Sequence, residues 1–204
     1  YLINGSPVFM GSAKDAVSKY LKDMHKLNEE RLKNEEILPA YVDLRESENR
    51  WEGYLQKIIS FVSTHRMDGS PSAVFKTGDS MRIRIGYHLD DEARSYNFQI
   101  NFLDYAATRV MQLHNTHNSS PLELKGEGYV EIVIDDMRLL SEQYIIMAEI
   151  TDQKTGQWLD CVPDTVRIKI EAGNYLGGVG LTLGQVTFAQ RSYWKNIPDS
   201  MDID

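Results

Sequence analysis

The stretch GEGYVEIVIDDMRLLSEQYIIMAEIT, from Gly126 to Thr151, carries a clear strand pattern. Apolar residues alternate with others twice within it, at Val130, Ile132 and Ile134 and again at Tyr144, Ile146, Ala148 and Ile150. Because successive side chains of a strand point to opposite faces, this period of two predicts two strands, each with one buried face. The connector carries Leu139 and Leu140, which we expect to plug the end of a sandwich. An antiparallel pair of strands cannot bury its own apolar face, so a second layer is required.

The rest of the chain supplies the pieces of that layer. The same alternation predicts strands at residues 57–64, 72–76, 80–88, 96–102, 108–113, 157–162 and 164–171, and one more at 185–194. Turn residues separate them, for example around Gly69 and Gly78. Counted with the two central strands and without residues 185–194, these are eight or nine short strands at regular spacing. They predict an all-β fold, an immunoglobulin-like antiparallel β-sandwich.

A different kind of segment precedes the strands. Residues 1–10 predict a short hairpin around an Asn-Gly turn. Ser12, with Asp15 three residues later, resembles a capping box and predicts the start of a helix. Residues 37–56 show no sustained periodicity and predict a linker. The chain opens at Tyr1 in a strand-like run, so we expect it to be part of a longer protein.

The composition is that of an ordinary globular domain. The 204 residues are 42% hydrophobic and 25% charged, which argues against a disordered chain. A net charge of −8 argues against non-specific binding to nucleic acid or to an anionic membrane. No apolar run approaches the roughly 20 residues of a membrane-spanning helix. The one cysteine, Cys161, cannot form an internal disulfide, which favours a reducing cytoplasm.

Signatures of catalysis are scarce. The sequence has no glycine-rich phosphate loop and no Gly-x-Ser-x-Gly nucleophile motif. His114 and His117 have the spacing of metal ligands, but a metal site needs three or four converging ligands and no partner is evident. Asp135 and Asp136 are neighbours, so their side chains point apart and do not form an acid–base pair. The sequence therefore predicts a protein with neither a catalytic nor a metal site.

Binding groups are better represented, on the polar faces of the predicted strands. The candidates are three amides, two cations, an indole and a carboxylate: Asn97, Gln99, Asn101, Arg167, Lys169, Trp158 and Asp160. Sugar recognition uses such groups, because amides, carboxylates and Arg bond hydroxyls while an aromatic ring packs under the pyranose. The alternative is that these residues are simply the solvated face of an antiparallel sheet.

Two features point to a dimer. Ile145, Met147 and Val133 are apolar on faces that should be solvated, which predicts a covered surface such as a dimer contact. A glycine-rich hinge precedes the strand at 185–194, and strand exchange is a low-cost route to a dimer. We expect this strand to add to a sheet of the partner subunit; the alternative is that it completes the sheet of its own chain.

Three segments in order resemble a known family: KIISFVSTHRMDGSPSAVFKTGDSMRIRIGY at 57–87, NFQINFLD at 97–104 and GEGYVEIVIDDMRLLSEQYIIMAEITD at 126–152. They are similar to the C-terminal domain of Wzt-type subunits, the ATP-binding subunits of ABC transporters that export bacterial O-antigen polysaccharide. FKTGD and the strand–Leu-Leu–strand unit are the best markers. The opening NGSPVFMGSAKDAVSKYLKDM resembles the end of an ABC nucleotide-binding domain, while the tail after Gly173 departs from the pattern.

The resemblance implies a division of the chain and a role for it. Residues 1–36 would close the nucleotide-binding domain, 37–56 would link, and 57–204 would form a carbohydrate-binding sandwich. That sandwich would dimerise, bind the non-reducing, often capped end of an O-polysaccharide, and mark it for export through the transmembrane subunit. ATP and Mg²⁺ would belong to the nucleotide-binding domain, and this chain would need no cofactor. The expected location is cytoplasmic, peripheral to the inner membrane.

Combining both lines, we place the sugar site on the face of the seven candidate residues, where Arg167 and Lys169 would bind an anionic cap. The other choice is the outer face of the opposite sheet, with Arg82, Arg84, His88, Tyr129 and Glu131. A rival function is a structural domain that only dimerises the transporter. A carbohydrate-active enzyme ranks third, because the sequence shows no convincing pair of facing carboxylates.

Overall fold

The computed structural model of the chain describes residues 2–3, 6–20, 23, 38–51, 56–118, 122–140, 142–171 and 192–198. The chain divides into two compact units, residues 1–37 and 38–204. Within the described residues, no helix is long and apolar enough to cross a membrane.

The first unit holds the predicted hairpin and helix start. β1 (Leu2–Ile3) pairs with β2 (Ser6–Pro7), and residues 13–20 are helical. The hydroxyl oxygen of Ser12 accepts a hydrogen bond from the backbone N–H of Asp15 at 3.2 Å and donates to its carboxylate at 2.7 Å. Ser12 is therefore the N-cap, as the capping pattern predicts. Residues 24–37 lie outside the described residues.

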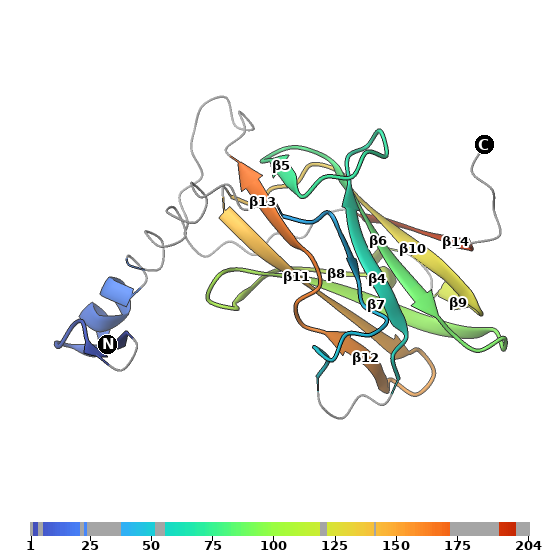
Figure 1. Ribbon diagram of the computed structural model, residues 1–204, viewed down its shortest axis with the longest axis horizontal. Helices are drawn as coiled ribbons and strands as arrows, with labels where there is room; N and C mark the ends of the chain where they lie inside the picture. The colour runs from blue at the N-terminus through green and yellow to red at the C-terminus, as the bar shows by residue number, and fades with distance from the viewer. Residues whose placement is uncertain are drawn as a thin grey trace. The chain divides into compact units, whose positions relative to one another are not determined.

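The second unit is built from two sheets (Figure 1). The five-stranded sheet has the order β14 (Ser192–Pro198), β10 (Glu127–Ile134), β6 (Met81–His88), β4 (Ile59–His65) and β3 (Tyr41–Asp43). The seven-stranded sheet has the order β5 (Val74–Lys76), β13 (Arg167–Glu171), β11 (Glu142–Asp152), β7 (Arg94–Leu103) and β8 (Arg109–His114). In the same sheet β12 (Trp158–Val162) also pairs with β11, and β9 (Leu122–Leu124) also pairs with β7.

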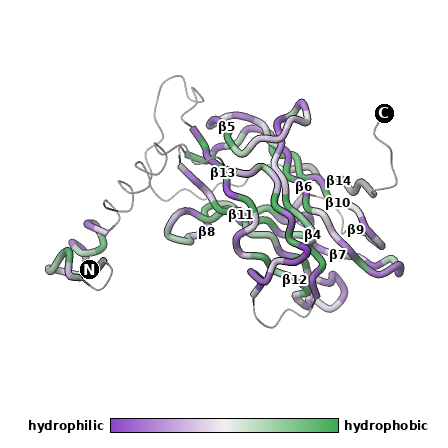
Figure 2. The backbone as a smooth tube through the Cα atoms, in the orientation of Figure 1, coloured by the Kyte–Doolittle hydropathy of each residue, from purple (hydrophilic) through white to green (hydrophobic). Residues whose placement is uncertain are grey.

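The inner faces of the two sheets enclose one hydrophobic core. Every apolar position that defined the alternation of the central stretch is buried: Val130, Ile132, Ile134, Tyr144, Ile146, Ala148 and Ile150. Figure 2 shows hydrophobic colour along the strands of this unit and hydrophilic colour in their connecting turns. The predicted all-β sandwich is confirmed. One pair departs from a purely antiparallel arrangement, since β5 runs parallel to β13.

The two strands of the central stretch lie in different sheets. β10 pairs with β6 and β14, whereas β11 pairs with β7, β12 and β13, so they do not form a pair with each other. Their connector crosses from one sheet to the other, and Leu139 is buried in the core as expected of a plug, while Leu140 is only half-buried. Each of the two strands thus packs against the sheet that contains the other, and this sheet is the second layer that the sequence requires.

The segment predicted as a linker, residues 37–56, is in part a piece of the sandwich. Residues 41–43 form β3, which pairs with β4, and the next residue, Leu44, is buried in the core. Arg50 forms a buried ion pair with Asp160 of β12. A strand of three residues is too short to show a period of two, so the sequence gives no periodic signal for it.

The predicted C-terminal strand falls partly on β14. Residues 192–198 pair with β10 of the same chain in antiparallel register, from Gly128 opposite Pro198 to Ile134 opposite Ser192. Residues 185–191 of that prediction lie outside the described part of the chain. In the single chain β14 therefore completes its own five-stranded sheet, which is the alternative that the sequence left open.

Candidate functional site

Strand register places six of the seven candidate residues on one face. Antiparallel partners directly opposite each other share a face of the sheet. The outer face of β7 and β11 carries three such pairs, Asn97 with Thr151, Gln99 with Glu149 and Asn101 with Met147. The same face continues onto β13 and β12, where Ile145 is opposite Arg167, Gln143 opposite Lys169 and Thr151 opposite Trp158.

The amides on this face converge on one carboxylate, Glu149. Gln99 Nε2 donates to Glu149 Oε2 at 2.7 Å, and Asn101 Nδ2 donates to Glu149 Oε1 at 2.8 Å. Gln112 of β8 extends this network of hydrogen bonds, because its Nε2 donates to Gln99 Oε1 at 2.7 Å. The sequence identified the amides but not Glu149 as their partner. The signal that finds it is the register of β7 against β11, which periodicity alone does not contain.

Burial changes the acidity of Glu149. The residue is only 1% exposed, and the loss of water around the carboxylate raises its pKa to about 7. The positive charge of Arg109 and the hydrogen bond from Asn101 oppose this rise without cancelling it. A carboxyl group that gains or loses its proton near neutral pH thus lies at the centre of the amide array.

Asp160 does not lie on this surface, which corrects the assignment from the sequence. The register shifts between Ile150 and Thr151, so that Thr151 is opposite Trp158 while Ile150 is opposite Asp160. A β-bulge at Leu159 breaks the alternation, and Asp160 points into the protein with Ile150. The carboxylate is fully buried, where Oδ2 accepts from the backbone N–H of Ile59 at 2.8 Å and pairs with Arg50. Its role is to hold the chain before β4 against β12.

The remaining candidates lie at opposite ends of the face. β12 pairs with residues 148–151 of β11 and β13 with residues 142–145, so Trp158 is far along the strand from Arg167 and Lys169. Trp158 is 42% exposed. Arg167 is exposed and bonded to Asp164 at 2.6 Å, whereas Lys169 is half-buried and lies 3.7 Å from Glu171. The structure groups Trp158 with Asn97 and the amide array, and the two cations separately.

Met147, which the sequence marked as apolar on a solvated face, is buried within the single chain, and Ile145 and Val133 are half-buried. The burial of Met147 therefore does not require a second subunit.

Cys161, opposite Glu149, is also buried. Burial raises the pKa of the Cys161 thiol to about 12, with a further contribution from the negative charges of Glu149 and Asp160. The thiol is thus in its unreactive protonated form at neutral pH.

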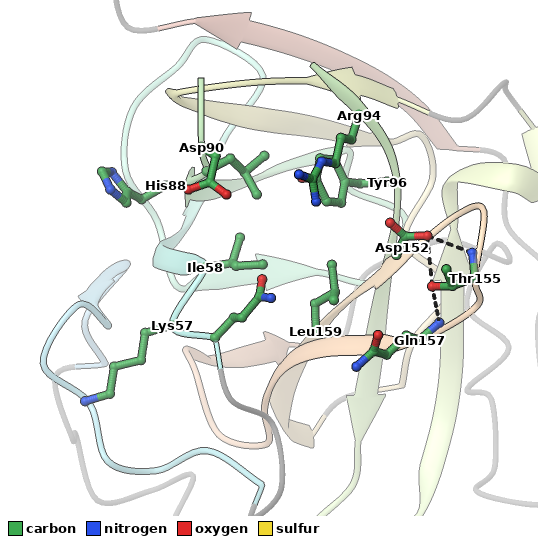
Figure 3. Close-up of a pocket in the computed structure, with 12 residues that line it drawn as sticks. Lys57, Ile58, His88, Asp90, Arg94, Tyr96, Asp152, Thr155, Gln157 and Leu159 are labelled. Atoms are coloured by element: carbon green, nitrogen blue, oxygen red, sulfur yellow. Dashed lines mark hydrogen bonds between the residues drawn. The ribbon is translucent and has the colours of Figure 1, made fainter. Parts of the chain in front are cut away.

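A pocket of about 410 Å³ opens at one end of the sandwich, between the two sheets. Figure 3 shows Asp90, Arg94 and Tyr96 on one side of it and Ile58, Leu159 and Gln157 on the other. Its rim is ordered by Asp152, whose Oδ1 accepts from the backbone N–H of Thr155 at 2.7 Å and from its hydroxyl at 2.9 Å. The lining mixes polar groups with apolar surface, as in pockets that bind small polar ligands.

On the opposite sheet, the alternative face is largely occupied by its own ion pairs. Arg84 donates to Glu131 at 2.9 Å, Arg82 lies 3.5 Å from the same carboxylate, and the guanidinium of Arg84 lies 5.1 Å above the ring of Tyr129. Glu131 and Tyr129 are buried. Only His88 of this set is exposed, and its Nδ1 lies 2.7 Å from Glu127. Four of the five residues therefore form a closed cluster.

The two histidines with metal-like spacing lie at the end of β8 and in α2 (Asn115–Asn118). Their ring centres are 5.3 Å apart, and Nδ1 of His114 lies 2.6 Å from the hydroxyl of Thr116. In the described part of the chain, no three His, Cys, Asp or Glu residues come together to hold a metal ion.

Comparisons with known proteins agree with one another. The model of a family described as the Wzt C-terminal domain matches residues 47–182. A crystal structure of the C-terminal domain of wzt superposes with a TM-score of 0.52 at 12% identity, covering 81% of this chain and 91% of that one. At this identity the superposition shows the fold alone. No curated protein matches the sequence.

Proposed function

Because the chain belongs to the Wzt C-terminal domain family, we propose that it recognises the non-reducing end of an O-antigen polysaccharide and couples this recognition to export by an ABC transporter. The family is a non-catalytic C-terminal domain, and we propose that its part in the transporter is binding. The site proposed here is the outer face of the seven-stranded sheet around Gln99.

One observation carries the proposal: an exposed indole and a row of amides share one face. Trp158, Thr151 and Asn97 lie in one line across β12, β11 and β7. Adjacent strands are about 4.8 Å apart, so this line spans about 10 Å. A pyranose packed on Trp158 would point its hydroxyl groups at the amides beyond it.

Two further features support a polar ligand here. Asn97 is only half-buried on this face, so part of the residue is accessible to a ligand packed on Trp158. In the next line, the half-buried Gln99 is held in a fixed orientation by its hydrogen bond to Glu149. Preorganised groups lose little entropy on binding and so favour affinity. In this proposal Arg167 and Lys169 contact a more distant part of the glycan or an anionic cap.

The same proposal covers the partners. Residues 1–36 would be the end of a nucleotide-binding domain that binds ATP and Mg²⁺, and the assembled protein would contact the transmembrane subunit on the cytoplasmic side of the inner membrane. We also propose a homodimer in which β14 exchanges between subunits. Because β14 is an edge strand that pairs with β10 through a register of seven residues, the same strand of a partner subunit would fit that edge in the same way.

A calorimetric titration with O-polysaccharide from the encoding strain tests the glycan site. Trp158→Ala is expected to weaken binding roughly threefold to tenfold, the loss of one aromatic contact. Trp158→Phe keeps an aromatic face and is the matched control. Unchanged affinity in Trp158→Ala together with Gln99→Ala would remove this face from the proposal. No binding by the unaltered chain would favour the rival, a domain that only dimerises the transporter.

A further inference from the structure

A second aromatic surface lies on the other sheet. The rings of Tyr41 of β3 and Phe61 of β4 are stacked with their centres 5.3 Å apart and their planes 29° apart. Tyr41 is 51% exposed, the largest exposed fraction among the described aromatic residues. Register places both side chains on the outer face, because Tyr41 is opposite Ser63 and Asp43 is opposite Phe61. An exposed ring stacked on a second ring is a rigid platform.

Gly86 of β6 leaves the space that the Phe61 ring occupies. A Cβ atom at residue 86 would lie 2.1 Å from Cδ1 and 2.2 Å from Cε1 of Phe61. Real Cβ atoms do not approach that closely, so the Phe61 ring lies directly over the backbone of β6 and needs glycine there. The register shift of β4 against β6 between Ile59 and Phe61 accompanies this placement. The platform is therefore built into the sheet.

The platform forms one wall of a pocket of about 480 Å³. Polar side chains surround it, and each lies close to a polar partner. Glu127 lies 2.7 Å from Nδ1 of His88, Nζ of Lys57 lies 2.7 Å from Glu48, and Nε of Arg45 lies 3.0 Å from Asp43. Fixed donors and acceptors around an aromatic face are the arrangement that binds a sugar ring.

The charges favour a hydroxylated ligand. The lining mixes the donors of Arg45 and Lys57 with the carboxylate of Glu127, so a ligand that both donates and accepts hydrogen bonds satisfies them. A phosphate only accepts and would meet the Glu127 carboxylate in the lining. Sugar hydroxyls do both. Lys57 and His88 also line the 410 Å³ pocket at the end of the sandwich, so the two pockets adjoin and could hold successive sugars of one chain.

We propose that Tyr41, Phe61, Lys57, His88 and Glu127 form a second sugar-binding site, in which a pyranose of the same polysaccharide packs on the Tyr41 ring. This proposal rests on the proposed glycan binding but lies on the opposite sheet from the Trp158 face. The chain would then hold the polysaccharide at two separate surfaces.

Hydroxyl-radical footprinting with purified O-polysaccharide from the encoding strain separates the two sites in one experiment. Tyr41 is expected to be oxidised at least threefold more slowly when the polysaccharide is bound. Met67 in the β4–β5 turn is exposed and lies outside both pockets, so its oxidation rate is the internal control. Protection of Trp158 without protection of Tyr41 overturns the second site and leaves the proposed function intact.

Substitutions give an independent measurement. Tyr41→Ala is expected to weaken polysaccharide binding roughly threefold to tenfold, whereas Tyr41→Phe, which keeps the ring, retains most of it. Equal affinity of Tyr41→Ala and the unaltered chain overturns the inference, whether or not Tyr41→Ala also changes the oligomeric state in sedimentation. Absence of any binding by the unaltered chain would instead overturn the proposed function, and this inference with it.

Discussion

The fold shifts the pKa of Glu149 into the neutral range. This residue is an acid on the outer face of a sheet, yet it is buried, and two amides hold it in place. Its pKa of about 7, compared with an ordinary value of 4.5, means that the folded chain binds this proton more tightly than the unfolded chain does. Between these two pH values the folded chain still holds the proton that the unfolded chain has lost.

This gives a pH dependence with a definite sign. Between about pH 4.5 and 7, the contribution of Glu149 lowers the free energy of unfolding as pH rises, by up to about 3 kcal/mol, and it is constant above this window. Glu149→Gln is expected to remove this component. The measurement is urea unfolding of the variant and the unaltered chain at pH 5 and pH 8.

Comparing the Glu149→Gln variant with the unaltered chain isolates the contribution of Glu149 to the pH dependence. Burial lowers the pKa values of His65 and His114, but these residues contribute equally to both proteins. Glu123→Gln, at an exposed position of β9, is the matched control and should leave the slope unchanged. Identical pH slopes for Glu149→Gln and the unaltered chain would contradict the account.

Arg50 anchors a segment that the sequence read as linker. It pairs with the buried Asp160 and donates to the carbonyl oxygens of Leu44 at 2.7 Å and Ile59 at 2.9 Å. Arg50→Ala would leave a buried carboxylate without its countercharge, so we expect a loss of about 3–5 kcal/mol in the free energy of unfolding. Chemical denaturation measures this.

The control for Arg50 is another arginine of the same segment. Arg45 pairs with Asp43 at an exposed position, and such pairs contribute less than about 1 kcal/mol. Arg45→Ala should therefore change the unfolding free energy little. If the two variants were equally stable, the buried pair would not anchor the segment.

At the scale of single elements, β12 shows where prediction from the sequence fails. Its strand is predicted within one residue of its observed start, and Trp158 is predicted on the correct face. Strict alternation puts Asp160 on that face as well, but the bulge at Leu159 turns it inward. A bulge adds one residue to a strand without any change in hydrophobic pattern, so periodicity cannot locate it.

The same limit applies to short elements. β3 and β9, of three residues each, escape prediction because they are too short to show the alternation. β5 is equally short but falls within the predicted strand at 72–76, and the strands of five or more residues between 57 and 171 are also found. Missing β3 also meant missing Tyr41 as a partner for Phe61. Their contact depends on which strands are neighbours, and sequence separation does not reveal this.

β14 allows a prediction about assembly. Truncation after Gly173 removes β14 and leaves the edge of β10 unpaired. If β14 is exchanged in a dimer, the truncated chain should sediment as a monomer, whereas the intact chain sediments as a dimer. A truncated dimer of unchanged stability would contradict exchange.

At the scale of the whole sandwich, our two proposals assign one binding surface to each sheet. The seven-stranded sheet offers Trp158 and the amide array, and the five-stranded sheet offers the Tyr41–Phe61 platform. The sequence predicted the two-sheet architecture because burial of alternating faces is a local property. It did not predict how residues of different strands combine into a site, because that depends on strand order and register.

Recognition of the polysaccharide end is tested by calorimetry with two glycan preparations. One preparation keeps its native non-reducing end, and the other has that end trimmed. The account predicts that the chain binds the intact glycan and that trimming abolishes most of the heat of binding. Equal binding to both preparations would contradict recognition of the end and indicate recognition of the repeat unit, and no heat with either would contradict glycan binding itself.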